Sequence, residues 1–345
     1  MRILLIATNK NHRLMGRMNA EPAPIGLAYI AGYLNPDRHH VKILDLNFEL
    51  LALANTFVDN PKKLNLYMKQ YKIKSNSNKN YLNYEYDEKS FKLLDHNTIQ
   101  AISVNDLMIP KLDEILEKFK PDIAGITCMF TMTHNRMIRI AQRVKKICNN
   151  AVVFAGGVHP TSSAELILKE EKSIDFISLY EGDQSFPQLI DYVNKKNNDT
   201  RSVRQTGILI NGKYYQTDGR IAPAGNNVNI KPEYGDLDIK LYSNFGEIGA
   251  YRFWWKKNTV ASTILSNRGC RARCSFCSVR SFNGKGVRGR SLKSVVDELQ
   301  FLKEYHGVNH VMWLDDDLLF DRERTIGMFN EMVKRNLNIT WDASN

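Results

Sequence analysis

The sequence predicts an α/β protein of two domains, in which a doubly wound parallel sheet is followed by the first strands and helices of a second array. Its length of 345 residues is enough for about two domains with buried cores. From residue 1 to about residue 195, short apolar runs alternate with amphipathic helical patterns, which is typical of parallel sheets covered by helices. The alternation resumes after residue 260. We therefore divide the chain into a domain at 1–195, a linker at 196–259 and a C-terminal domain at 260–345.

The expected strands of the first domain are short and rich in β-branched residues, as buried parallel strands are. They are Ile3–Ala7, Val41–Leu44, Ile123–Thr127, Val152–Ala155 and Phe176–Leu179. A helix is expected at Ile25–Leu34, before Asn35-Pro36, and another where apolar residues recur at helical spacing from Met137 to Ile147. Residues 51–105 are long for a connection and polar at their centre, so we interpret them as an insertion.

The rest of the chain begins with a hairpin signal and then repeats the strand–helix order. The hairpin is centred on Asn211-Gly212, a dipeptide that favours a tight turn, and lies within the linker. The expected elements of the C-terminal domain are a strand at Val260–Leu265, a helix from Ser291 to Gly307, a strand at His310–Leu314, a helix at about 322–335 and a strand from Ile339. This order is that of the opening of a (β/α) barrel.

Composition and charge exclude several classes of protein. No apolar run approaches the roughly 20 residues that span a bilayer, and the first apolar run is too short for a signal peptide. Five cysteines, three of them clustered, do not form a disulfide framework, so we expect a reducing, oxygen-poor cytoplasm. The net charge of +11 permits an anionic partner without requiring one, and part of it surrounds the clustered cysteines.

The clustered cysteines are the strongest chemical signal in the chain. Cys270, Cys274 and Cys277 have the spacing C-x3-C-x2-C and follow an expected strand, so they belong to a loop at its C-terminal end. Three thiolates on one loop can bind three irons of a [4Fe–4S] cluster and leave the fourth iron open to an exchangeable ligand. The alternatives are a three-thiol zinc site, which lacks the usual fourth ligand, or three unrelated core cysteines.

Other candidate residues lie where parallel strands end. Thr127 closes one strand, and Gly156-Gly157 after the next would let the backbone approach a flat, bulky ligand, or would form an ordinary tight turn. His159 follows, and is more readily interpreted as a turn or helix-start residue than as a ligand. The isolated Cys128 and Cys148 are expected to be packing residues.

The stretch from Asn267 to Cys277 resembles the cluster-binding loop of the radical SAM superfamily, with Phe276 as the aromatic residue before the last cysteine. The resemblance implies that S-adenosylmethionine (AdoMet) binds the open iron and is cleaved to a 5′-deoxyadenosyl radical. It also implies that Asp315 and Asp316, which end the second strand of the barrel, line the AdoMet site together with Phe276. The family often has Asp-Asp-x-Phe there, whereas Leu318 stands at the Phe position of this chain.

The N-terminal half resembles the flavodoxin-like cobalamin-binding domain that precedes the barrel in one radical SAM group. The resemblance rests on the motifs Pro-x-Pro-x-Gly-Leu, Gly-Gly-x-His-Pro-Thr and Glu-Gly-Asp, and it implies that Thr127, Gly156, Gly157 and His159 line a cobalamin site. The chain departs from the Asp-x-His-x-x-Gly pattern of other cobalamin domains, because His12 and Gly16 do not have its spacing. We therefore expect that His12 does not bind the lower face of cobalamin.

Together these resemblances predict a cobalamin-dependent radical SAM enzyme, or its N-terminal portion, with methyl transfer to an unactivated substrate centre as the expected reaction. The alternatives are a methylthiotransferase-like enzyme that modifies RNA, or a non-catalytic cobalamin- and cluster-binding subunit of a split enzyme. The expected partners are a small-molecule or natural-product substrate, an electron donor such as flavodoxin or ferredoxin, and a C-terminal chain if the enzyme is split. We also expect an incomplete barrel, because the family barrel has about three more strand–helix units than precede Asn345. The residues do not identify the substrate or the catalytic groups.

Overall fold

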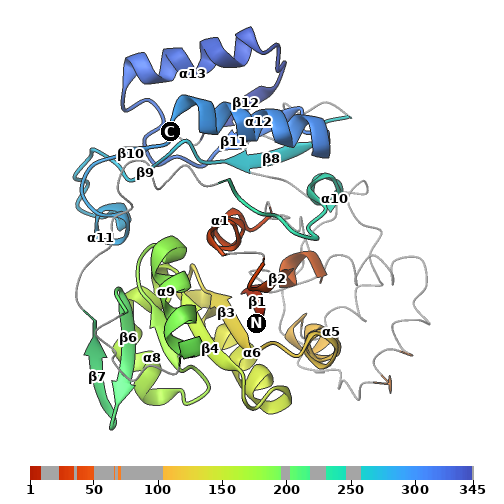
Figure 1. Cartoon of the computed structure of the whole chain (residues 1–345), viewed down its shortest axis with the longest axis vertical. Coiled ribbons are helices and arrows are strands. Elements are labelled where there is room, and N and C mark those ends of the chain that lie inside the picture. Colours follow the sequence, from red (N-terminus) through yellow and green to blue (C-terminus); the bar gives the residue numbers. More distant parts are fainter. Residues whose placement is uncertain are drawn as a thin grey trace, which may run out of the picture.

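The structure is a computed structural model that describes residues 1–8, 23–34, 37–49, 66, 69–70, 104–195, 203–217, 231–245 and 258–343. It has an N-terminal part built on a seven-stranded sheet and a C-terminal part built on a three-stranded sheet, with helix α1 between them (Figure 1). Most of the expected insertion at 51–105, the loop with His12 and Gly16, and much of the linker lie outside the described residues.

The first five strands form the doubly wound parallel sheet that the alternating sequence pattern predicts. Its strand order is β2-β1-β3-β4-β5, followed by β6 and β7. The strands are β1 (Arg2–Ala7), β2 (His40–Asp45), β3 (Ile123–Thr127), β4 (Val152–Gly156) and β5 (Phe176–Ser178). The order reverses at β1, which pairs in parallel with both β2 and β3. Ligands of such sheets bind beyond the carboxyl ends of the strands at this switch point.

Helices cover both faces of this sheet. They are α1 (Ile25–Tyr33), α5 (Val104–Phe119), the 3-10 turn η1 (Thr131–Thr133), α6 (His134–Ile147), α7 (Val158–Ser162), α8 (Ala164–Glu170) and α9 (Gly182–Lys195). Alternate residues of β1 point to opposite faces: Leu4 and Ile6 pack in one core with α5, α6 and α8, while Ile3 and Leu5 pack in the other with α1 and α9. All four side chains are at most 1% exposed. This alternation explains why the strand is apolar along its whole length.

The hairpin predicted around Asn211-Gly212 is present, but it is part of the sheet. Strands β6 (Thr206–Ile210) and β7 (Lys213–Gln216) pair antiparallel, and β6 also pairs antiparallel with β5. Asn211 and Gly212 both have positive φ, which a two-residue hairpin turn requires. The segment that we expected to be a linker therefore contributes two strands to the first sheet, and β7 is the edge strand.

The C-terminal part has the strand–helix order of an opening barrel. Its elements are α10 (Ile239–Phe245), β8 (Ala261–Ile264), β9 (Asn267–Arg268), α11 (Val279–Asn283), β10 (Arg288–Gly289), α12 (Leu292–His306), β11 (His310–Trp313), α13 (Arg322–Lys334) and β12 (Thr340–Ala343). Strand β11 pairs in parallel with β8 and β12. Helix α12 begins where the Ser291 hydroxyl accepts from the amide of Ser294, and ends at Gly307 with φ of 70°.

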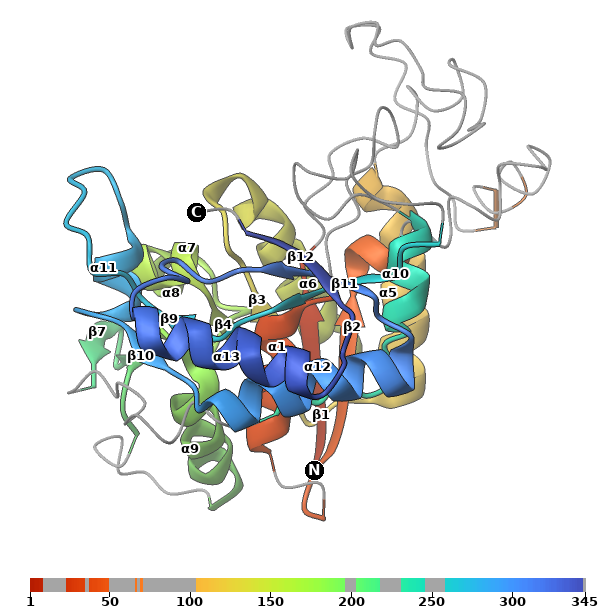
Figure 2. The same ribbon diagram turned by 90° about the horizontal axis from the view of Figure 1, so that it is seen from above.

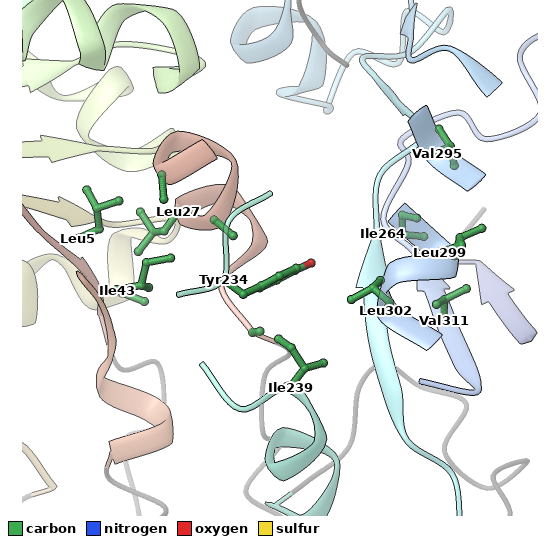
Figure 3. Packing of buried hydrophobic residues seen from close by; sticks show 14 of the residues in the cluster. Leu5, Leu27, Ile43, Tyr234, Ile239, Ile264, Val295, Leu299, Leu302 and Val311 are labelled. Atoms are coloured by element: carbon green, nitrogen blue, oxygen red, sulfur yellow. The ribbon is translucent and has the colours of Figure 1, made fainter. Parts of the chain in front are cut away.

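The two parts share one hydrophobic core. Leu27 of α1 belongs to the same buried cluster as Ile264 of β8 and Leu299 of α12, with Tyr234 and Ile239 between them (Figure 3). Figure 2 shows α12 and α13 lying across α1 when the molecule is seen from above. Among the described residues, no helix is long and apolar enough to cross a membrane.

Candidate functional site

A cleft of about 560 Å³ lies between the carboxyl ends of the first sheet and the C-terminal domain. On the first side it is lined by residues that end β1, β3, β4 and β5 and by the start of α1. On the second side it is lined by Leu265, Asn267, Arg268, Ser278, Val279, Phe282, Asn283, Leu314 and Asp316. Because both sheets present their strand ends to it, the cleft occupies the ligand position expected of each sheet.

The wall from the first sheet includes three of the residues that we expected at a cobalamin site. Thr127, Gly156 and Gly157 all line the cleft. Gly157 has φ of +108°, and a Cβ there would lie 2.7 Å from the carbonyl oxygen of Cys128, so only glycine fits this turn without strain. The turn therefore packs closely against the backbone of Cys128, and Gly156 and Gly157 add no side chain to the cleft.

The structure places His159 differently from a cofactor ligand. Its Nδ1 lies 3.2 Å from the Thr131 hydroxyl and its Nε2 lies 2.9 Å from Nδ1 of His134, and the side chain is buried behind the glycine turn. His159 is not among the residues that line the cleft. Burial, and secondarily the neighbouring His134, lower its pKa. These contacts match the interpretation of His159 as a turn or helix-start residue.

The two isolated cysteines have the packing roles that the sequence predicts. Cys128 is fully buried against Thr133 and the carbonyl of Phe130, and burial raises the pKa of its thiol. Cys148 is partly buried at the end of α6. A raised pKa makes a thiol less reactive, so neither residue is a candidate nucleophile.

The clustered cysteines lie on one loop, residues 269–287, which connects β9 to β10. Cys270 lines a second cavity of about 390 Å³ beside Asp316 and Asp317, while Cys274 and Cys277 are exposed to solvent. Within the described residues, no three His, Cys, Asp or Glu side chains converge on a single metal position. A [4Fe–4S] cluster does not require that convergence, because each thiolate binds a different iron. The preference for a cluster over zinc rests on the number of thiolates, because a structural zinc site normally has four protein ligands.

Phe276 is 90% exposed and lines neither of the two cavities described above. The structure therefore does not bring Phe276 to the cavities that Asp316 lines, and its expected contact with AdoMet stays a prediction.

The three consecutive aspartates after β11 have three different environments. Asp315 is 1% exposed, and its carboxylate accepts from the amide and hydroxyl of Ser266 and from the amide of Asn267 at 2.5 to 3.0 Å. It thus fixes the strand end before the cysteine loop and does not line either cavity. Asp316 lines both cavities and accepts from the Asn283 amide at 3.1 Å. Asp317 pairs with Arg271 at the surface.

These environments separate a structural carboxylate from a candidate ligand-binding one. Burial raises the pKa of Asp315 and of Asp316, whereas the hydrogen bond from Arg271 lowers the pKa of Asp317. Of the two aspartates that we expected at the AdoMet site, only Asp316 faces the cavities. The residues alone do not reveal which aspartate of the run points inward.

Sequence reasoning missed the partners of the basic residues around the cysteines. Part of the positive charge of the chain surrounds the clustered cysteines, and several of these side chains pair with carboxylates. Arg268 and Arg288 pair with Glu181 of the first domain, and Arg290 pairs with Glu298 of α12. The Glu-Gly-Asp motif that follows β5 was the available signal, since it carries two carboxylates at a strand end.

A buried cluster of polar side chains also joins the domains beside the cleft. The Arg290 guanidinium donates to the Tyr29 hydroxyl at 2.7 Å and to the Glu298 carboxylate at 2.6 Å. Tyr29 belongs to α1 and lines the cleft. Burial raises the pKa of Tyr29 and of Glu298.

Comparison with known proteins relates the chain to a B12 binding domain and to a methyltransferase. Residues 92–190 match the family model of the B12 binding domain. The chain is 30% identical over 246 residues to an uncharacterized methyltransferase of Pyrococcus horikoshii, a match that covers 69% of this chain and 49% of that protein. The chain therefore spans about half the length of this relative.

Two solved structures have the same fold over nearly the whole chain. One is the cobalamin-dependent S-adenosylmethionine radical enzyme OxsB with aqua-cobalamin and S-adenosylmethionine bound, with a TM-score of 0.65, 16% identity, and coverage of 99% of this chain and 38% of that one. The other is the radical S-adenosylmethionine methyltransferase TsrM from Kitasatospora setae with cobalamin and a [4Fe-4S] cluster bound. Its TM-score is 0.60 at 16% identity, and the match covers 97% of this chain and 52% of that one. The chain thus has a region that matches the B12 binding domain, a methyltransferase relative that aligns with more than two thirds of its residues, and the fold of two solved radical enzymes.

Proposed function

We propose that this chain is the cofactor-binding portion of a cobalamin-dependent radical SAM methyltransferase that acts on a small-molecule substrate. The observation that carries the proposal is the single cleft bounded by the Gly156-Gly157 turn on one side and by Ser278 and Val279, next to Cys277, on the other. A corrinoid against the glycine turn and a cluster on the cysteine loop would therefore face the same space. Such proximity is needed if a methyl group and a substrate radical are to meet.

The chain's own side chains have distinct tasks in this proposal. Cys270, Cys274 and Cys277 would bind three irons, and Asp316, which lines both cavities, would accept hydrogen bonds from AdoMet. Asp315 would hold the strand end from which the cysteine loop starts, through Ser266 and Asn267. When bound, the cofactors supply reductive cleavage of AdoMet and methyl transfer, with the electron coming from an external donor such as flavodoxin or ferredoxin.

The donor set and the walls fit these cofactors by simple chemical tests. Thiolates are the usual ligands of iron–sulfur clusters, and three of them leave one iron for an exchangeable ligand. The Gly157 turn has no room for a side chain, since a Cβ would collide with the Cys128 carbonyl. Apolar residues such as Leu5, Leu27 and Phe154 also line the cleft, and they would exclude water from a bound macrocycle.

Separate loss of the two cofactors tests the proposal. The chain would be reconstituted without oxygen with iron, sulfide and hydroxocobalamin, and its iron content and corrinoid absorption measured. We expect Cys274→Ala to lose the cluster and keep the corrinoid, and Gly156→Leu to lose the corrinoid and keep the cluster. Cys148→Ala, which changes a cysteine outside both cavities, should keep both. Zinc in place of iron in the wild type, or retention of the corrinoid by Gly156→Leu, would contradict the proposal.

A further inference from the structure

Two short strands, β9 (Asn267–Arg268) and β10 (Arg288–Gly289), form the base of the cysteine loop, and we call this pair the neck. Strands β9 and β10 pair antiparallel at the base of the loop, and Arg268 lies opposite Arg288 in this pair. Just inside the neck, Gly269 has φ of +87° and a Cβ there would overlap the carbonyl oxygen of Gly286. All three clustered cysteines and α11 lie between these two glycines. The neck therefore fixes where the segment that carries the cysteines begins and ends.

One carboxylate from the other domain contacts both strands of the neck. Glu181 accepts from Nη1 of Arg268 at 3.2 Å and from Nη1 of Arg288 at 3.0 Å, and it also pairs with Nη2 of Arg288. These side chains are only 9% to 14% exposed. Asp183, two residues later, forms an ion pair with Arg268 alone. Ion pairs to arginine at such low exposure are strongly directional and hold geometry well.

The neck needs a counter-charge because of its own pairing. Like charges directly opposite each other on antiparallel strands are destabilising, and Arg268 and Arg288 are such a pair. Glu181 removes that repulsion by binding both guanidiniums. Arg288 donates in addition to the carbonyl of Asn283 at the end of α11, so the same link reaches the far side of the cysteine loop.

Other contacts hold the two domains together without Glu181. The shared core runs from Leu27 through Tyr234 to Leu299, and the Arg290 cluster joins α1 to α12. Loss of Glu181 would therefore weaken the link between the first domain and the cysteine loop while leaving the domains docked.

We propose that Glu181 is a positioning residue that couples the first domain to the cysteine loop, so that docking of the domains sets the geometry of the cluster site relative to the cleft. This inference deepens the proposed function and rests on it for the identity of the cluster, but not for the mechanical link between Glu181 and the neck.

The mechanical link is tested first, on protein without cofactors, by hydrogen exchange of backbone amides. We expect Glu181→Gln to exchange at least about tenfold faster than wild type in residues 267–289, with unchanged rates in α12 and β1. Arg288→Met removes the link from Glu181 to β10 and keeps the link to Arg268 of β9. It should also speed exchange in residues 267–289, but by less than Glu181→Gln does. The matched control is Asp113→Asn, which loses an ion pair to Arg143 between α5 and α6. Neck rates equal to those of Asp113→Asn would overturn the proposal whether or not the chain binds a cluster.

The coupling is tested second, on reconstituted protein, by the effect of AdoMet on the electron paramagnetic resonance of the reduced cluster. Glu181→Gln should keep wild-type iron, sulfide and corrinoid contents but require about tenfold or more AdoMet for the spectral change. A variant that instead loses the corrinoid and keeps its AdoMet response would show that Glu181 binds cobalamin directly, and would overturn the positioning role. A wild type without any AdoMet response would contradict the proposed function, and the exchange rates would still decide the mechanical link.

Discussion

Replacing Arg290 by Met should destabilise the folded chain more than any exposed charge deletion. The Arg290 and Glu298 side chains are 3% and 1% exposed, and their charged atoms lie 2.6 Å apart. Arg290 also donates to the Tyr29 hydroxyl, to the Leu265 carbonyl at 2.8 Å and to the Ser294 hydroxyl at 2.9 Å. The substitution therefore leaves a buried carboxylate without its counter-charge between the two domains.

The magnitude follows from that uncompensated burial. Breaking a buried ion pair on one side costs about 3–5 kcal/mol, whereas removing a single hydrogen bond to a charged group costs about 1.5–3 kcal/mol. We therefore expect a loss of about 3–5 kcal/mol for Arg290→Met and a smaller loss for Glu298→Gln. The double variant Arg290→Met/Glu298→Met should lose less than Arg290→Met alone, because it leaves no buried charge.

The assay is the free energy of unfolding from urea titration of the wild type and the variants. The matched control is Arg335→Met, whose ion pairs with Asp297 and Glu331 involve side chains 22% to 43% exposed. Such surface pairs contribute about 0–1 kcal/mol. A loss for Arg290→Met no larger than that for Arg335→Met, or a double variant less stable than the single one, would refute the reasoning.

Three further changes test the local geometry by the same titration. Gly157→Ala should lower the free energy of unfolding by about 1–3 kcal/mol, because φ is +108° and the new Cβ meets the Cys128 carbonyl. Gly156→Ala, whose new Cβ has its nearest contact at 3.5 Å, should stay within about 1 kcal/mol of wild type. Equal losses of stability in the two variants would contradict this. Asp315→Ala should cost about 2–5 kcal/mol, because two buried amides and a hydroxyl lose their charged acceptor, and a loss below about 1 kcal/mol would show that these contacts are not formed. Burial raises the pKa of Asp316, so its carboxyl group keeps its proton to a higher pH in the folded state than in the unfolded chain. The free energy of unfolding of wild type relative to Asp316→Asn should therefore fall as the pH rises from about 4 and then level off. A free-energy difference that rises with pH would contradict the burial of Asp316.

The sequence predicts the elements of this fold well where one local rule dominates. Ile3–Ala7 and Val152–Ala155 are apolar along their whole length because parallel strands are buried on both faces, and the structure confirms both strands within a residue. Helix α12 begins at the expected serine cap and ends at the expected glycine. Cap residues act on their own helix, so no tertiary information is needed to locate them.

The features that the sequence does not predict depend on which elements meet in space. The Asn211-Gly212 turn predicts a hairpin but does not say that β6 pairs with β5. The run Asp315-Asp316-Asp317 does not reveal that the first carboxylate binds Ser266 and that, of the three, only the second lines the main cleft. Glu181 binds Arg268 and Arg288, which lie 87 and 107 positions further along the chain. Local patterns contain no information on such pairings.

The central claim is that the glycine turn and the cysteine loop face one cleft, so that a corrinoid and a cluster bind close together. The most direct test is the magnetic interaction between cob(II)alamin and the reduced cluster in the anaerobically reconstituted chain, measured by electron paramagnetic resonance. The account predicts that the corrinoid signal broadens and relaxes faster when the cluster is reduced, and that Cys274→Ala abolishes this change. A corrinoid signal that is the same with and without the reduced cluster would contradict it.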